Sequence, residues 1–175
     1  MDCEYIIGCS AMKAITGSII LVVAFAATTV FAAQSPTSKR VETLQRERAS
    51  LSQTTDAVRR ARGEMKISDL VLEFISDSVR ADNVDSLDAN INDYRAAILD
   101  ARDSLVQSRR DPLRKPQGFR DVELALRRQS RRLDDLAKEL PVEQRQQINK
   151  LIEEVKVIRN EMLNAILGTA LHPNF

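Results

Sequence analysis

The side chains best suited to binding a ligand are two arginine doublets in the C-terminal half of the chain. The doublets start four residues apart, so on a helix their guanidinium groups lie within about one turn. Guanidinium groups bind phosphates and carboxylates through paired N–H donors. Two further cations precede them, and together they make a candidate basic patch for an anionic partner. The patch consists of Arg114, Lys115, Arg127, Arg128, Arg131 and Arg132.

Acidic neighbours give the same cations a purely structural interpretation. Glu123 lies four residues before Arg127, and Asp135 lies four residues after Arg131. Opposite charges at this spacing face each other on a helix. We prefer internal pairing over docking as the first explanation of the doublets.

The residue types that catalysis requires are scarce. The one histidine, His172, lies beside Pro173 near the C-terminus, and the two cysteines, Cys3 and Cys9, lie near the N-terminus. No glycine-rich phosphate loop is present. Acidic pairs such as Asp134–Asp135 lack the neighbouring histidine of a metal site in a helical bundle. The sequence therefore predicts no catalytic, cofactor or metal site, and the protein is not expected to be an enzyme.

An export signal is predicted at residues 12–32. Met12 and Lys13 form a short basic start, Ala14–Phe31 carries no charge, and Val30-Phe31-Ala32 resembles a signal-peptidase site. Residues 1–11 contain Asp2 and Glu4, which do not suit a signal, and are interpreted as a misassigned N-terminal extension. The alternative is an uncleaved single membrane anchor, since twenty residues span a bilayer core of roughly 30 Å. Only in that case do we expect membrane attachment.

Composition narrows the class of protein once the signal is removed. Removing the first 32 of 175 residues leaves 143 residues, with 25 basic and 23 acidic side chains and no cysteine. Such a chain corresponds to one periplasmic or secreted domain held together by its apolar core. The balanced charge and the lack of tryptophan argue against nucleic acid as a partner.

Apolar residues at helical spacing predict an all-α fold. A flexible leader (33–39) precedes a helical domain (40–168) and a C-terminal tail (169–175). We expect a long first helix from about Ser38 to Ala81, a turn capped by Asp85 or Ser86, and a stop at Gly168. Three coiled-coil-like seams follow the turn. The expected architecture is an elongated antiparallel bundle of three to four helices. The seam residues are Leu87, Ile91, Tyr94, Ile98, Ala101 and Leu105; Phe119, Val122, Leu126, Gln129, Leu133, Leu136 and Leu140; and Ile148, Leu151, Ile152, Val155, Ile158, Met162 and Ile166.

The start of the first helix has sparse apolar positions, at Val41, Leu44, Leu51 and Val58. We expect these side chains to lack a partner within one bundle, which predicts a homodimer formed through the first helix.

The connector from Asp111 to Phe119 contains two prolines and a glycine, which exclude a helix through it. It is interpreted either as a recognition loop or, preferably, as a rigid corner. An Asx turn at Asp111 and burial of Phe119 would hold such a corner in place.

Two resemblances arise from these residues. The Asp111–Glu143 segment resembles small exported bacterial helical proteins of unknown function, which implies export and helical pairing but no activity. Leu140-Pro141-Val142-Glu143-Gln144 is similar to the Leu-Thr-x-x-Gln motif of periplasmic chaperones of the Spy and CpxP type. Leu140 and Gln144 match, and Pro141 replaces the threonine. That similarity implies a helical protein that binds unfolded clients.

Together these observations predict an exported, non-catalytic interaction or structural protein of the bacterial cell envelope. Its partner would be an unknown envelope protein or a polyanion. The alternative is a periplasmic holdase-type chaperone.

Overall fold

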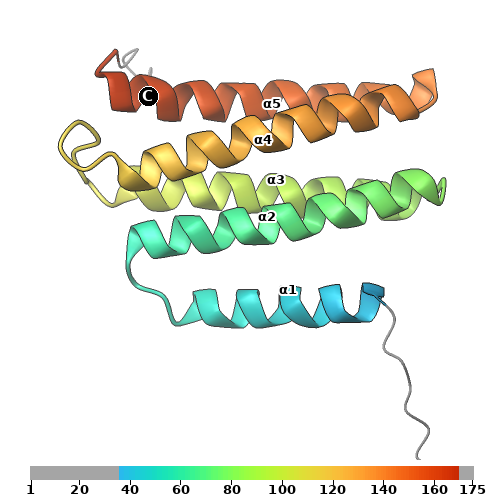
Figure 1. Cartoon of the computed structure of the whole chain (residues 1–175), viewed down its shortest axis with the longest axis horizontal. Coiled ribbons are helices and arrows are strands. Elements are labelled where there is room, and N and C mark those ends of the chain that lie inside the picture. The colour runs from blue at the N-terminus through green and yellow to red at the C-terminus, as the bar shows by residue number, and fades with distance from the viewer. Residues whose placement is uncertain (1–35, 170–175) are drawn as a thin grey trace, which may run out of the picture. The chain divides into compact units, whose positions relative to one another are not determined.

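The computed structural model describes residues 36–169, which form five α-helices (Figure 1). Consecutive helices run in opposite directions, and these residues contain no strand. The all-α prediction is confirmed, although the helices number five rather than three to four. The bounds are α1 Pro36–Ser52, α2 Ala57–Arg80, α3 Val84–Gln107, α4 Gln117–Glu139 and α5 Val142–Leu167.

Several predictions fall outside the described residues. They concern the N-terminal extension, the signal segment, residues 33–35 of the leader, and residues 170–175 of the tail, which include His172. Residues 36–39, the rest of the predicted flexible leader, form the start of α1 instead. Within residues 36–169, none of the helices combines the length and the hydropathy needed to cross a membrane.

The predicted long first helix is wrong, because the chain turns between α1 and α2. The N–H of Thr54 donates to the carbonyl of Leu51 at 2.9 Å. Asp56 then caps α2, its carboxylate accepting from the N–H of Arg59 at 2.8 Å. Such a cap satisfies one of the unpaired N–H groups at a helix start. Residues 53–56 contain neither proline nor glycine, so the usual helix breakers did not signal this turn.

A glycine on α2 lets α1 fold back against it. A Cβ atom at Gly63 would lie only 2.4 Å from Cδ2 of Leu51. Leu51 and Val58 are buried, and Leu44 packs against the core. The expectation that these apolar residues lack a partner within the chain is therefore wrong. Val41, which is 41% exposed, is the exception.

The three predicted seams form the core of the remaining helices. Every seam residue of α3 and α4 is buried, as is Leu140, which follows α4. The α5 seam is buried from Ile148 to Met162, and Ile166 is partly buried. α2 packs against α1, α3 and α4, whereas α5 packs against α3 and α4.

The start of α3 is capped two or three residues earlier than expected. Asn83, rather than Asp85 or Ser86, caps α3, and its side-chain oxygen accepts from the N–H of Ser86 at 3.0 Å. Asp82 adopts a left-handed conformation with a φ of 50°. Aspartate tolerates this region better than most residues, which explains the use of Asp82 in the turn.

The connector between α3 and α4 has the features of the predicted rigid corner. The Asp111 carboxylate accepts from the N–H of Leu113 at 2.9 Å, which forms the expected Asx turn. Phe119 is buried, as predicted. Gly118 permits close packing, because a Cβ there would lie 2.6 Å from Cδ2 of Leu105. At the end of α5, Gly168 terminates the helix as predicted, with a φ of 68°.

Candidate anion-binding surface

A buried polar cluster aligns α4 with α2 and α3. Gln129 is fully buried, and its side-chain oxygen accepts from the hydroxyl of Tyr94 at 2.8 Å. Its amide nitrogen donates to Oγ of Ser68 at 2.8 Å and to the carboxylate of Asp69 at 2.7 Å. These contacts fix the rotation of α4 and hence the direction in which its arginines point. Burial, with a smaller contribution from Asp69, raises the pKa of the Tyr94 hydroxyl and keeps it protonated as a donor.

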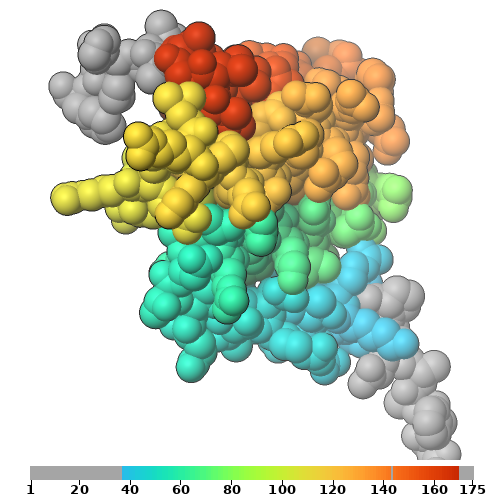
Figure 2. All heavy atoms as spheres, turned by 60° about the vertical axis from the view of Figure 1, so that its left-hand side comes forward, coloured from blue at the N-terminus to red at the C-terminus, as the bar shows by residue number. Residues whose placement is uncertain are grey.

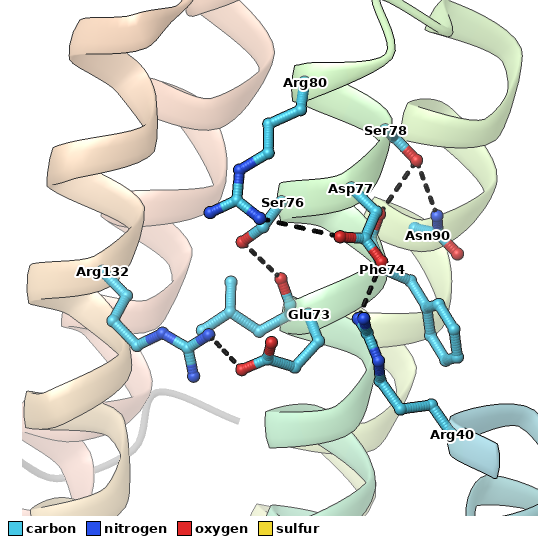
Figure 3. A network of polar contacts seen from close by, with 10 residues as sticks. Arg40, Glu73, Phe74, Ser76, Asp77, Ser78, Arg80, Asn90 and Arg132 are labelled. Atoms are coloured by element: carbon cyan, nitrogen blue, oxygen red, sulfur yellow. Dashed lines mark hydrogen bonds and ion pairs between the residues drawn. The ribbon is translucent and has the colours of Figure 1, made fainter. Parts of the chain in front are cut away.

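The C-terminal half of α2 binds polar side chains from three other helices (Figure 3). Arg40 of α1 pairs with Asp77 at 2.7 Å, and Arg132 of α4 pairs with Glu73 at 2.5 Å. On α3, the Asn90 amide donates to the hydroxyl of Ser78 at 3.0 Å. One of the six candidate cations, Arg132, is therefore held by a contact between helices.

Arg127 is also paired, in the way its spacing predicts. Its guanidinium group contacts the Glu123 carboxylate at 2.6 Å, four residues earlier on the same helix. Glu123 is 4% exposed, so this pair compensates a buried carboxylate. Internal pairing thus accounts for Arg127 and Arg132.

The other member of each doublet remains available to solvent. Arg128 and Arg131 are exposed and form no ion pair within residues 36–169. The expected partner of Arg131, Asp135, instead binds Lys138 at 2.7 Å. That hydrogen bond raises the pKa of Lys138.

The two cations of the connector lie at a distance from the doublets. Arg114 contacts Asp111 at 3.5 Å, whereas Lys115 is exposed and unpaired within the described part of the chain. At 1.5 Å per helical residue, the length of α4 from its start to Arg128 is roughly 16 Å. The cations of the connector and the doublets are therefore separated along the length of α4.

Arg120, which the sequence analysis did not single out, lies between these two groups. It is exposed and forms no ion pair within residues 36–169. At 100° per residue, Arg120 and Arg131 lie only about 20° apart around the helix axis. Their spacing of eleven residues, or three turns, was the signal that could have identified Arg120. We call Arg120, Arg128 and Arg131 the free arginine face of α4.

Charge is distributed unevenly between the two ends of the helices. The α1–α2 and α3–α4 connections lie at one end, and the α2–α3 and α4–α5 turns lie at the other (Figure 1). Residues 56–62 and 108–121, at the first end, include eight basic and three acidic residues. Residues 77–88 and 134–145, at the second end, include eight acidic and three basic residues. We call the first end the basic end. Figure 2 shows the connector between α3 and α4, in yellow, projecting from the surface at this end.

This arrangement suits the binding of an anion. Within the described residues, no three His, Cys, Asp or Glu side chains are grouped so as to hold a metal ion. The exposed guanidinium groups of α4 and the cations of the basic end can each donate hydrogen bonds to phosphate or carboxylate oxygens. No family model, curated protein or solved structure matches the chain.

Proposed function

We propose that this chain is a non-catalytic interaction protein of the bacterial cell envelope that binds an anionic partner through the free arginine face of α4 and the basic end. The observation that carries the proposal is the difference within the doublets. Arg127 and Arg132 are neutralised by Glu123 and Glu73, whereas Arg128 and Arg131 are exposed without a carboxylate.

The connector supports the same proposal. Its Asx turn and buried Phe119 hold the backbone in place, so Lys115 is presented from a fixed corner rather than from a loose loop. Leu113, which is 62% exposed, directly precedes the two cations of the connector, Arg114 and Lys115. A preorganised surface loses less conformational entropy when it binds a partner.

The proposal that this protein lies in the cell envelope is supported by the sequence alone. The apolar segment Ala14–Phe31 and its peptidase-like end support export to the periplasm, with a retained membrane anchor as the alternative. A homodimer through α1 remains a proposal with weaker support, since Leu51 and Val58 are already buried within one chain.

Charge-matched variants test the binding surface. The double variant R128Q/R131Q removes two exposed cations without disturbing an ion pair. K39Q/K150Q removes two exposed cations elsewhere and serves as the control. Each chain would be crosslinked in the native envelope and recovered with its partners. We expect the captured partner to be reduced several-fold with R128Q/R131Q and unchanged with K39Q/K150Q.

The chemistry of the partner can be tested with purified components. Vesicles containing phosphatidylglycerol and a soluble polyanion such as heparin would each be titrated at low and high salt. Exposed charges are screened beyond about 10 Å at 0.1 M salt, so binding should weaken as salt rises. Equal binding by both double variants, or binding that does not respond to salt, would contradict the proposal.

A periplasmic holdase chaperone is the second candidate function, and exposed apolar side chains favour it. Val142, Val157 and Leu167 are each more than half exposed. Of the two residues that match the chaperone motif, Leu140 is buried and Gln144 donates to the Asp82 carboxylate at 3.1 Å. A light-scattering assay of client aggregation separates the two functions, because only the chaperone should suppress aggregation at an equimolar ratio.

A further inference from the structure

A groove of about 320 Å³ lies among α1, α2 and α3, away from the basic surface of α4. Leu51, Ile67, Ala96 and Ala97 provide the apolar wall, and Ser52 and five charged side chains line the remainder. This volume is at the lower end of the range for sites that bind small molecules. The charged lining residues are Arg48, Arg60, Glu64, Asp93 and Asp100.

Glu64 is the unusual member of this lining. Glu64 is only 8% exposed, yet its carboxylate forms no hydrogen bond or ion pair within residues 36–169. Burial raises the pKa of Glu64, and the nearby Asp100 carboxylate raises it further, while Arg60 and Arg48 act in the opposite direction. Its carboxylate oxygens remain accessible from the groove, so a cation in the groove would be stabilised by their negative charge.

The charges of the groove are nearly but not fully balanced. Arg48 is already engaged with Asp93 at 2.9 Å, which leaves Glu64, Asp100 and Arg60 without ion-pair partners in the described part of the chain. These three groups carry one excess negative charge when the carboxylates are ionised. One monovalent cation would complete the balance.

We propose that this groove binds a small primary alkylammonium compound, with the ammonium group donating to Glu64 and the alkyl chain lying against Leu51 and Ile67. The apolar wall favours an organic cation over a metal ion. The described residues also offer no group of three metal-ligating side chains. Arg60 also belongs to the basic end, but the groove shares no residue with the free arginine face of α4, so either proposal can fail without the other.

The test is a titration of the ¹⁵N-labelled full-length chain with n-butylammonium chloride at neutral pH, followed by amide chemical shifts. We expect saturable shifts at the residues that line the groove, and none with n-butanol, which lacks the charge. E64Q keeps the size of the side chain and should weaken binding about tenfold or more, because a hydrogen bond between ions is lost. E153Q removes an exposed carboxylate of α5 and should bind as the original chain does.

A second variant keeps the test decisive if E64Q alters folding. Asp100 is exposed, so D100N should fold normally and weaken binding by a smaller factor than E64Q. Three results would each overturn the proposal. They are equal affinity in the original chain, E64Q and D100N; shifts spread over the acidic turns instead of the groove; and saturation by Mg²⁺ where n-butylammonium has no effect.

Discussion

Replacing Gln129 with leucine tests whether the buried cluster stabilises the packing of α4 against α2 and α3. The substitution keeps a side chain of similar size and removes hydrogen bonds to Tyr94, Ser68 and Asp69. Tyr94 is fully buried, and a buried hydroxyl without an acceptor costs about 1–3 kcal/mol.

The other contributions are smaller. Asp69 is half-buried, so water replaces much of the lost bond and leaves a cost of roughly 0.5–1 kcal/mol. Ser68 keeps its own hydrogen bond to the carbonyl of Met65 at 2.9 Å. The leucine gains about 1 kcal/mol from apolar burial. The free energy of unfolding should therefore fall by about 2 kcal/mol, which corresponds to about 4–8 °C in Tm for a chain of this size.

Urea unfolding followed by circular dichroism measures this change, and a double-mutant cycle identifies its origin. Adding Tyr94→Phe to the Gln129→Leu variant removes the unsatisfied hydroxyl and should recover about 1–2 kcal/mol. Gln147→Leu, at an exposed position of α5, serves as the control and should stay within about 0.5 kcal/mol of the original. The reasoning is refuted if Gln129→Leu is as stable as the original chain, or if Tyr94→Phe has the same effect in both backgrounds.

Three further predictions concern the caps, the α1 contact and pH. Asn83→Ala should lower the free energy of unfolding by about 1 kcal/mol and Asp85→Ala by about 0.5 kcal/mol, and a larger cost at Asp85 would contradict the cap observed here. Gly63→Ala should overlap Leu51 and accelerate amide hydrogen exchange in α1 relative to α3; unchanged exchange would show that the contact is unimportant. Burial raises the pKa of Tyr94, so the folded chain keeps a proton that the unfolded chain loses above about pH 10. Stability present below that pH should decline above it, and Tyr94→Phe should flatten this part of the profile in urea titrations; an identical decline in the variant would assign it to other groups.

The helices themselves were predictable because helical periodicity is a local property. Residues three and four positions apart share a face whatever the rest of the chain does, so the seams of α3, α4 and α5 could be identified before the fold was known. The α1–α2 turn was missed for a related reason. Leu51 and Val58 continue a helical spacing across the turn, and only the return of α1 onto Gly63 shows that the chain must break between them.

The partners of the candidate arginines were predicted only in part. The pair between Arg127 and Glu123 follows from a spacing of four residues, and it forms. The same spacing suggested a pair between Arg131 and Asp135, but Asp135 binds Lys138 instead. Arg132 pairs with Glu73, which lies 59 residues away in the sequence. No local pattern indicates a partner at that distance.

The sequence by itself determined the helical class, the seams, the connector with its Asx turn and the helix stop at Gly168, since each depends on residues a few positions apart. Only the tertiary structure decided which arginines stay exposed without a partner, which side chains Gln129 binds, and that Glu64 lines a groove. These properties depend on how α1 to α4 are rotated and paired, which is set by contacts between residues distant in the chain. The physical reason is that helical spacing defines the faces of a helix, whereas burial and charge pairing depend on which faces meet.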